Sequence, residues 1–332
     1  MHSKNIQHVI KKYVENVIDA YKSIKTKHKN SNKVNLPYKI KKYYTTGWDV
    51  QSIKRYNNYI LLSRPQKTIN NKIVRFKPYR CYIKNPPENI VEVELIYRGN
   101  KYYLAIKYKI ESEYLQIQSK NEASIDLGEI HSITSIDNNG NALIITGRYI
   151  RSIKRLRNKN YATLQKKRDK CKKYSNQWNK YNRAINKLKW KFNNKILDST
   201  HKISKLYVDY CIEHNISTVY YGDLDSCTRN TKKRVGKMVG QKLNQWNYGQ
   251  LMRLLENKLD KYNIKLVKVK EYYTSKKCPK CEKLNKPSGR NYECRHCDYI
   301  MHRDINGAIN ILNDNSDYYI TRYSNMKYLR IT

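Results

Sequence analysis

The chain has 332 residues and carries 68 lysines and arginines against 27 aspartates and glutamates, a formal net charge of +41 at pH 7. An excess of this size makes a compact fold repel itself unless a polyanion shares its surface, so we expect a nucleic acid partner. The 32 tyrosines fit that partner, because tyrosine can stack on bases and still reach water. Four of the eight cysteines stand singly, which argues against the disulfide framework of a secreted protein.

The length predicts two or three domains with a sizeable core. We expect no membrane span, because the sequence has no apolar run of about 18 residues near its start, and we expect no signal peptide. These features favour an intracellular protein. It would be cytoplasmic and nucleoid-associated in a prokaryote, and nuclear or in a viral factory in a eukaryote or virus.

The first third of the chain predicts a small β-barrel or sheet with a helical insertion. Apolar residues at helical spacing predict a helix over residues 6–28, and a helical pattern recurs around residues 50–62. From residue 72 to residue 107 the pattern alternates as in strands. Arg98-Gly99-Asn100-Lys101 is a good hairpin turn before a strand over residues 102–108.

A second domain begins near residue 122 and alternates strands with helices. A short apolar strand ends at Asp126, and a hairpin over residues 131–147 follows. A very basic helical region is expected over residues 151–212, with an inner stripe of Trp178, Tyr181, Ile185, Leu188 and Phe192. The remaining expected elements are a strand (217–224), a helix (245–262), a strand (264–272) and a last helix opened by Asp304. This order predicts a mixed α/β sheet of the ribonuclease H-like class.

Four cysteines near the end of the chain predict a structural zinc site. They form two Cys-x-x-Cys pairs, separated by twelve residues: Cys278, Cys281, Cys294 and Cys297. Zinc takes four tetrahedral ligands, and each such turn brings two sulfurs towards one ion. His296 and His302 lie nearby, but four thiolates already complete the site, so we expect neither histidine to be a ligand.

Two carboxylates are candidate ligands for catalytic magnesium. Asp126 ends the first strand of the second domain, and Asp304 lies at the start of the last helix. Hydrolysis of a phosphodiester by two divalent ions needs a few carboxylates that converge from different elements at the end of a central strand. Each residue also has an ordinary alternative: Asp126 as a turn residue at a strand end, and Asp304 as an acid favoured by the helix dipole.

These motifs together resemble the TnpB (OrfB) family, RuvC-like proteins encoded by insertion sequences and related to type V CRISPR effectors. The resemblance covers residues 120–312. It rests on Asp126-Leu-Gly128 with Glu129-Ile-His131, Tyr220-Tyr-Gly-Asp-Leu224, Glu271-Tyr-Tyr-Thr-Ser275, the cysteines and His302-Arg-Asp-Ile-Asn-Gly-Ala-Ile-Asn310. It implies a guide RNA, a target DNA with a short adjacent motif, and cutting by a RuvC site. A separate transposase encoded by the same element would be a further partner, not in a stable complex.

The resemblance also implies a domain plan. Residues 1–118 would form a WED-like β-barrel with a helical recognition insertion, and residues 119–271 the RuvC-like nuclease domain with its basic helical region, 151–212. Residues 272–301 would form the zinc ribbon, and residues 302–332 the RuvC C-terminal helix and tail.

One departure from the family concerns the third catalytic acid. The family usually places a glutamate just before Asp-Leu on the fourth strand, where this chain has Gly222. Asp223 is adjacent, but neighbouring strand residues face opposite sides. Glu271, near the end of the next strand, is close enough to serve, since neighbouring strands lie about 4.8 Å apart. A shifted acid before Thr-Ser resembles the Fanzor branch, so we assign Glu271, with Asp223 as the alternative and an exposed strand-end acid as the ordinary reading.

Two further departures concern the ribbon and the start of the chain. Glycine commonly follows each Cys-x-x-Cys pair, whereas this chain has Glu282 and Asp298. Glutamate tolerates the left-handed backbone conformation poorly. We therefore expect the turn formed by Cys278 and Cys281, the first knuckle of the ribbon, to be less tightly folded. The chain also opens into a helix where the family's barrel usually has a strand, a difference that bears on guide binding.

For contacts with nucleic acid we select the basic residues that follow the third strand of the second domain. They are Arg148, Arg151, Lys154, Arg155 and Arg157. Contacts with the phosphate backbone are expected here rather than reading of bases. The ordinary alternative is a charged face in contact with solvent.

Three functions are compatible with the sequence. The first is a metal-dependent, RNA-guided DNA endonuclease of a transposable element, with Asp126, Glu271 and Asp304 as its ligands. The second is an RNA-guided DNA-binding protein that does not cut, acting as a regulator or a decayed transposon remnant; Gly222 favours it. The third, a strand-joining transposase, uses the same metal chemistry but does not match the ribbon-and-helix ending.

Overall fold

The computed structural model describes residues 3–26, 45–64, 66–69, 72–99, 101–109, 119–223, 236, 240–242, 245–270, 273–287 and 289–331. The chain divides into two compact units, Met1–Glu111 and Ser112–Thr332. Among the helices of the described residues, none combines the length and the apolar character needed to cross a membrane.

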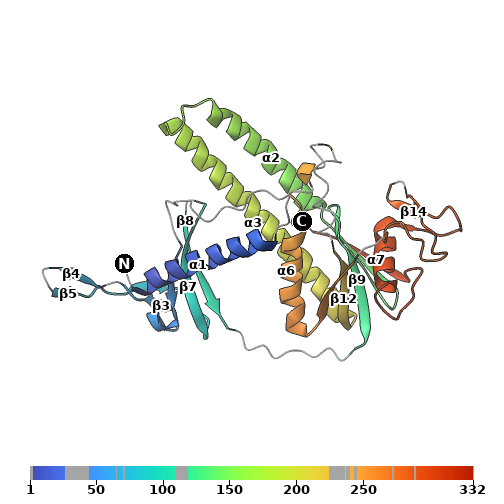
Figure 1. The fold of residues 1–332 in the computed structure, drawn as a ribbon, viewed down its shortest axis with the longest axis horizontal. Helices are drawn as coiled ribbons and strands as arrows, with labels where there is room; N and C mark the ends of the chain where they lie inside the picture. Colours follow the sequence, from blue (N-terminus) through green and yellow to red (C-terminus); the bar gives the residue numbers. More distant parts are fainter. Residues whose placement is uncertain are drawn as a thin grey trace. The chain divides into compact units, whose positions relative to one another are not determined.

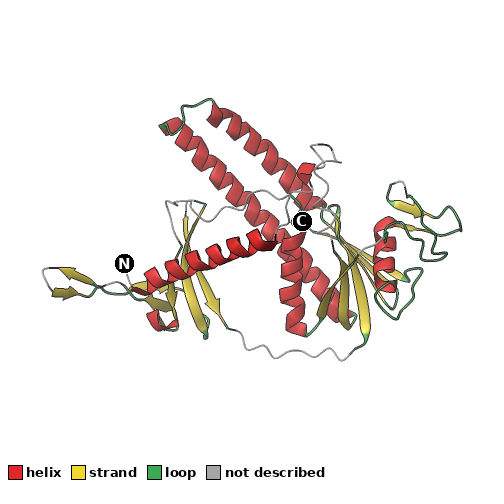
Figure 2. Cartoon of the chain, in the orientation of Figure 1, coloured by secondary structure: helices red, strands yellow, loops and turns green. Residues whose placement is uncertain are grey.

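The N-terminal unit contains one long helix and several short sheets (Figures 1 and 2). Its helix is α1 (Ser3–Thr26), and its main sheet has the order β1-β7-β8, with β1 (Thr46–Asp49), β7 (Ile90–Arg98) and β8 (Lys101–Tyr108). A second sheet has the order β2-β3-β6, with β2 (Ile53–Arg55), β3 (Tyr59–Leu62) and β6 (Tyr79–Tyr82). A two-stranded ribbon joins β4 (Lys67–Ile69) to β5 (Lys72–Val74).

The helix predicted over 6–28 is confirmed up to Thr26, the last described residue of that segment, and the hairpin at residues 98–101 is also confirmed. The helical pattern around residues 50–62 was wrong. Only Val50–Ser52 forms a 3₁₀ turn (η1), and strands occupy most of the remaining segment. The reason is packing: Ile60 and Leu62 alternate along β3 and are buried in the small core with Trp48.

The polar side of α1 contacts the β1-β7-β8 sheet. His8 Nδ1 lies 2.8 Å from Glu92 Oε1, and Lys12 pairs with the buried Glu94. Lys107 on β8 also pairs with Glu92. Ionic contacts therefore fix α1 on this sheet.

The C-terminal unit is built on one six-stranded mixed sheet with the order β13-β12-β9-β10-β11-β16. Its strands are β9 (Asn121–Asp126), β10 (His131–Asp137), β11 (Asn141–Thr146), β12 (Ile216–Gly222), β13 (Lys265–Val269) and β16 (Asn325–Arg330). β9, β10 and β11 are antiparallel neighbours, whereas β12 runs parallel to β9 and β13 parallel to β12. The mixed sheet and the order of its elements along the chain agree with the predicted ribonuclease H-like class. The edge strand β16, parallel to β11, had not been predicted.

The main helices that the structure describes in this unit are α2 (Arg148–Asp169), α3 (Asn176–Glu213), α6 (Tyr248–Leu259), followed by the 3₁₀ turn η3 (Asp260–Tyr262), and α7 (Arg303–Asn313). The basic helical region thus splits into a hairpin of α2 and α3 (Figure 1). Ser175 is the N-cap of α3, because its hydroxyl accepts a hydrogen bond from the backbone N–H of Trp178. A small hairpin, β14 (Asn291–Glu293) and β15 (Ile300–His302), precedes α7.

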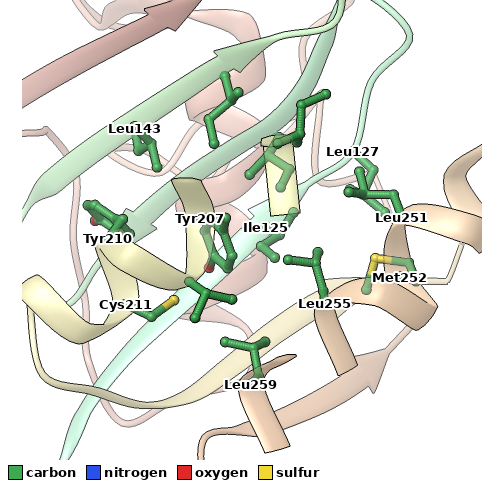
Figure 3. Close-up of a cluster of buried hydrophobic side chains, with 14 of the residues drawn as sticks. Ile125, Leu127, Leu143, Tyr207, Tyr210, Cys211, Leu251, Met252, Leu255 and Leu259 are labelled. Atoms are coloured by element: carbon green, nitrogen blue, oxygen red, sulfur yellow. The ribbon is translucent and has the colours of Figure 1, made fainter. Parts of the chain in front are cut away.

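Helices cover both faces of this sheet. On one face, Ile125 and Leu127 of the β9 segment pack against Tyr207 of α3 and Leu255 of α6 (Figure 3). On the other face, α7 and the cysteine ribbon pack against residues of β10 and β11 such as Ile144. Because successive strand residues face opposite sides, Ser124 and Asp126 of β9 face α7. The Ser124 hydroxyl accordingly donates to the carbonyl of Ala308 at 2.6 Å.

Candidate active site

Asp126 and Asp304 line one cavity of about 240 Å³ in the C-terminal unit. Asp126 is the last residue of β9, and Asp304 lies in the first turn of α7. The other lining residues come from the β9–β10 turn, β10, the segment after β13 and the start of α7: Leu127, Gly128, His131, Thr134, Thr274, Ser275 and Arg303. The two acids chosen from the sequence therefore face the same space.

A glycine of α7 leaves room for the Asp126 carboxylate. A Cβ atom at Gly307 would lie only 2.8 Å from Asp126 Oδ2. The close approach of α7 to β9 thus brings the helix backbone, with Asp304 one turn earlier, against the strand end that carries Asp126.

Asp304 is held by groups from three parts of the unit. His131 Nδ1 lies 2.7 Å from Asp304 Oδ2, and Arg290 Nη1 lies 3.7 Å from the same oxygen. His302 caps α7, since its Nδ1 accepts from the backbone N–H of Asp304 at 3.3 Å. Burial alone would raise the pKa of Asp304, but the hydrogen bond with His131 and the nearby His302 and Arg290 outweigh it and hold the pKa below its ordinary value. Asp304 is therefore an ionised carboxylate at neutral pH.

The cavity also contains a buried polar atom without a partner. Thr134 is paired directly with Asp126 across β9 and β10, and within the described residues its buried Oγ1 has no hydrogen-bond partner. A buried hydroxyl usually has a partner, in protein or ordered water. Two carboxylates and this hydroxyl provide the oxygen ligands and water contacts that a hydrated magnesium ion needs, so the residues fit that ion.

The four cysteines of the ribbon converge as a tetrahedral set. Cys278 Sγ lies 3.7 Å from Cys297 Sγ, and Cys281 Sγ lies 3.6 Å from Cys294 Sγ, with all four sulfurs within 4.8 Å of one another. Four thiolates about 2.3 Å from one zinc ion would be about 3.8 Å apart. The cluster could therefore hold zinc.

The ribbon is anchored on α7 by two buried asparagines. Asn310 Nδ2 donates to the carbonyls of Thr274 and Lys277, at 2.6 and 2.8 Å, and Asn306 Nδ2 donates to the carbonyl of Lys277 at 3.1 Å. Arg290 lies just before β14 of the same ribbon. The fold of the ribbon thus sets the position of a cation beside Asp304.

Glu282 adopts the left-handed conformation that was expected to be unfavourable there, with φ of 60°. We predict that Glu282→Gly stabilises the first knuckle by about 0.5–1 kcal/mol, because the relief of left-handed strain exceeds the entropy cost of glycine. A competition titration with a zinc chelator would measure the gain. Asp298→Gly is the matched control and should give no gain, because Asp298 does not have positive φ and its carboxylate pairs with Lys280. Equal or weaker zinc retention in Glu282→Gly would contradict this account.

Comparison with known proteins finds similar sequences and a similar fold. A family model described as "Probable transposase" matches residues 105–227, and one described as "Cas12f1-like, TNB domain" matches residues 248–311. A TnpB-like protein of Methanocaldococcus jannaschii is 29% identical over 197 residues, which cover 58% of this chain and 69% of that protein. The chain is similar to proteins of the TnpB (OrfB) family.

Two further proteins are similar to this chain, one in sequence and one in fold. A protein named putative RNA-guided DNA endonuclease InsQ, of Escherichia coli, is 27% identical over 215 residues, which cover 60% of this chain and 53% of InsQ. The solved structure of a Cas12f1–sgRNA–target DNA complex has a TM-score of 0.62 at 17% identity, covering 88% of this chain and 67% of that chain. The fold likeness supports the predicted α/β fold with its mixed sheet. Membership of the Fanzor branch stays a prediction.

The position where the TnpB family usually has a glutamate is Gly222, the last residue of β12. The alternative acid, Asp223, pairs with Lys268 of β13, with Nζ 2.9 Å from Oδ1. Lys268 lies beside Tyr221, which packs in the core on the α3 and α6 side of the sheet. Asp223 is not among the residues that line the 240 Å³ cavity. The preferred third acid, Glu271, lies outside the described residues, although Thr274 and Ser275 shortly after it line the cavity.

Sequence reasoning selected none of His131, Thr134 and Arg290 as a site residue, although His131 belongs to the motif that carries the family resemblance. Thr134 lies in the predicted hairpin over 131–147, but its pairing with Asp126 across β9 and β10 is seen only in the structure. His131 follows the Asp-Leu-Gly motif but carried no spacing signal of its own. Arg290 gave no local signal either, because the fold of the ribbon alone brings it to Asp304.

The five basic residues selected for nucleic acid contact all lie on the first turns of α2. Arg151, Lys154 and Arg155 line a second cavity of about 720 Å³, together with Lys159 of α2 and Lys242. Arg157 instead donates to Gln245 Oε1 at 2.9 Å, and burial lowers the pKa of its guanidinium. Arg148 is exposed and does not line this cavity. The structure therefore brings three of the five together.

The charge of Lys154 lowers the stability of the folded protein. Burial, then repulsion from Arg157, lowers its pKa to about 8, although Glu129 offsets part of the effect. Because the folded protein binds this proton less tightly than the unfolded chain does, the charge destabilises the fold below pH 8, and the penalty disappears as the pH rises towards 10.5. A half-buried cation that lines a cavity with other basic residues is suited to a phosphate ligand.

We predict that Lys154→Met raises the stability of the free protein by about 1–2 kcal/mol at pH 7, after allowance for solvent screening. The same variant should bind nucleic acid more weakly and with a shallower salt dependence, because one phosphate contact is lost. Thermal melting and salt titrations would measure the two effects. Lys159→Met removes an exposed charge from the same cavity and should weaken binding without stabilising the fold. A Lys154→Met protein that melts lower than the parent chain would disprove the burial argument.

Proposed function

We propose that this protein is an RNA-guided DNA endonuclease of a transposable element that cuts its target by a magnesium-dependent RuvC mechanism. The single observation that carries the proposal is the shared cavity of Asp126 and Asp304 at the end of β9 in a ribonuclease H-like sheet. The relatives named above as a TnpB-like protein and an RNA-guided endonuclease support the same function.

Asp126, Glu271 and Asp304 would hold the catalytic magnesium. When bound, the ions would stabilise the charge on the attacking and leaving oxygens of the phosphodiester. Asp304 is already ionised and oriented for this role, because His131 holds its carboxylate and His302 holds its backbone at the start of α7. Thr134 would position a water molecule next to Asp126, since its hydroxyl is buried beside that residue and needs a partner.

Arg290 would act on the substrate. Its guanidinium is partly exposed and lies 3.5 Å from His131 Nδ1 and 3.7 Å from Asp304 Oδ2. A guanidinium presents a fork of donors that suits phosphate oxygens. In this position Arg290 would bind the scissile phosphate and neutralise part of its charge as the bond breaks.

Cys278, Cys281, Cys294 and Cys297 would bind one structural zinc ion. The separations of their sulfurs match a tetrahedral thiolate set. His296 and His302 would not be ligands: the backbone N–H of His296 donates to Cys294 Sγ, and His302 caps α7. Zinc would maintain the shape of the ribbon, and magnesium would serve the reaction.

The expected partners are a guide RNA and a target DNA. The net charge of +41 and the cavity lined by Arg151, Lys154 and Arg155 support them. Within the expected domain plan, residues 1–118 would contribute to guide and target recognition and residues 119–332 would contain the nuclease. A separate transposase would mobilise the element without forming a stable complex with this protein.

The deciding experiment begins with sequencing of the RNA that co-purifies with the full chain. That RNA, with its guide segment reprogrammed, is then incubated with the protein, Mg²⁺ and a library of matched DNA targets with randomised flanks. Cleavage next to a defined flanking motif is the expected result. Matched DNA that stays intact in Mg²⁺, although the complex binds it, would disprove the endonuclease.

A second candidate function is guided DNA binding without cleavage. The observation that favours it is Gly222, which removes the usual acid from β12. Programmed complexes that bind the matched target tightly, and leave it intact with Mg²⁺ or Mn²⁺, are the result expected of such a regulator.

A further inference from the structure

One face of the β2-β3-β6 sheet in the N-terminal unit carries a row of tyrosine rings. Tyr56 and Tyr59 stack with ring centroids 4.6 Å apart and an angle of 15° between the rings. Tyr59 and Tyr82 are partners across β3 and β6, with ring centroids 6.2 Å apart. Tyr82 is 76% exposed and Tyr56 is 41% exposed.

These rings lie on the outer face of the sheet. Ile60 and Leu62 of β3 are buried in the small core, so the alternating residues Tyr59 and Leu61 point the other way. A cross-strand pair of aromatic residues stabilises a sheet and would explain the contact of Tyr59 with Tyr82. It does not explain why most of the Tyr82 ring stays in water.

The surroundings of the rings are basic. The Arg80 guanidinium lies 4.8 Å from the centre of the Tyr59 ring, and Lys54 is paired with Leu61 on the same face. The sequence from Ile53 to Lys84 contains no aspartate or glutamate but nine basic residues: Lys54, Arg55, Arg64, Lys67, Lys72, Arg75, Lys77, Arg80 and Lys84. Exposed rings with cations and without acids fit an anionic ligand that has flat aromatic groups, which is a nucleic acid with unpaired bases.

We infer that Tyr56, Tyr59 and Tyr82, with Arg80 and Lys54, form a tyrosine platform that binds unpaired bases of RNA. The inference rests on the proposed function, which supplies an RNA partner. Duplex bases are stacked inside the helix and cannot reach exposed rings, whereas single-stranded RNA splays its bases onto sheet-borne aromatic residues. The tyrosine hydroxyls at the ring edges can also hydrogen-bond to the ribose 2′-OH, which DNA lacks.

The test measures binding of the full chain to a fluorescein-labelled oligouridylate, in EDTA and at raised salt. Raised salt weakens the general attraction of the basic chain for phosphates and leaves stacking visible. Tyr82→Ala and Tyr56→Ala are each expected to weaken binding about 5- to 100-fold, whereas Tyr82→Trp retains it. Binding of an RNA duplex should not change in any of these variants.

Tyr102→Ala is the matched control, because Tyr102 is 58% exposed on β8 of the same unit but lies on another sheet. Equal losses in Tyr102→Ala, or equal losses for the RNA duplex, would overturn the platform. An oligothymidylate that depends on Tyr82 as strongly as the oligouridylate does would show that the ligand is single-stranded DNA and the RNA assignment wrong. If Tyr82→Ala lowers the melting temperature, Tyr82→Leu decides, because it keeps an apolar cross-strand contact and lacks a flat ring.

The two proposals fail separately. Binding in EDTA involves no cleavage, so a chain that binds oligouridylate through the platform and cuts no DNA disproves only the endonuclease. A chain that cuts guided DNA while Tyr82→Ala and Tyr56→Ala bind oligouridylate normally disproves only the platform.

Discussion

Asp304→Asn is expected to lower the rate of guided DNA cleavage by about 10³-fold or more while leaving guide and target binding unchanged. The change keeps the size of the side chain and removes the charge that would hold the metal. The helix start should survive, since the backbone N–H of Asp304 still donates to His302. Single-turnover cleavage with saturating complex, measured beside a gel-shift assay of the same complex, separates chemistry from binding.

Graded controls make this prediction specific. His131→Asn should cost about 10- to 100-fold, because it loosens the orientation of Asp304 without removing a ligand. Raised Mg²⁺ should recover part of that loss and none of the loss in Asp304→Asn. Glu271→Gln should behave as Asp304→Asn does, and Asp223→Asn should cut normally. If Glu271→Gln cuts normally and Asp223→Asn does not cut, Asp223 is the third metal ligand and Glu271 is not.

The sequence was sufficient for the parts of the site that lie next to strong local patterns. Asp126 ends an apolar strand, and Asp304 lies at the start of an amphipathic helix. Both positions could therefore be predicted from the sequence. The order of the core strands followed from the antiparallel hairpin and the later alternation with helices. The cysteine spacing predicted a cluster whose sulfurs do converge.

What the sequence could not show depends on contacts between distant segments. Arg290 reaches Asp304 only because the ribbon folds back onto α7. β16 is a short strand of mixed polar and apolar residues, and it pairs with β11 from a distant part of the chain. The prediction of a helix over residues 50–62 was wrong because the apolar spacing there also suits a helix. Burial of Ile60 and Leu62 beside Trp48 instead requires strands.

Removal of zinc is expected to abolish cleavage although no catalytic carboxylate is touched. Cys278 and Cys294 are buried in the same core cluster as Ile305 of α7, so the ribbon and the helix share one packing unit. Structural zinc sites of this type bind with about 10–16 kcal/mol, more than the stability of most domains. Loss of the ion should therefore unfold the ribbon, displace Arg290 and loosen the start of α7.

Cys281→Ser tests this, with zinc content by mass spectrometry, thermal melting and cleavage in excess Mg²⁺ as readouts. The expected result is loss of one zinc ion per chain, a lower melting temperature of the C-terminal unit and loss of cleavage. Cys171→Ser changes a single cysteine near the end of α2 and should alter none of the three. Full cleavage by a zinc-free protein would refute the coupling, because Arg290 depends on the ribbon for its position beside Asp304.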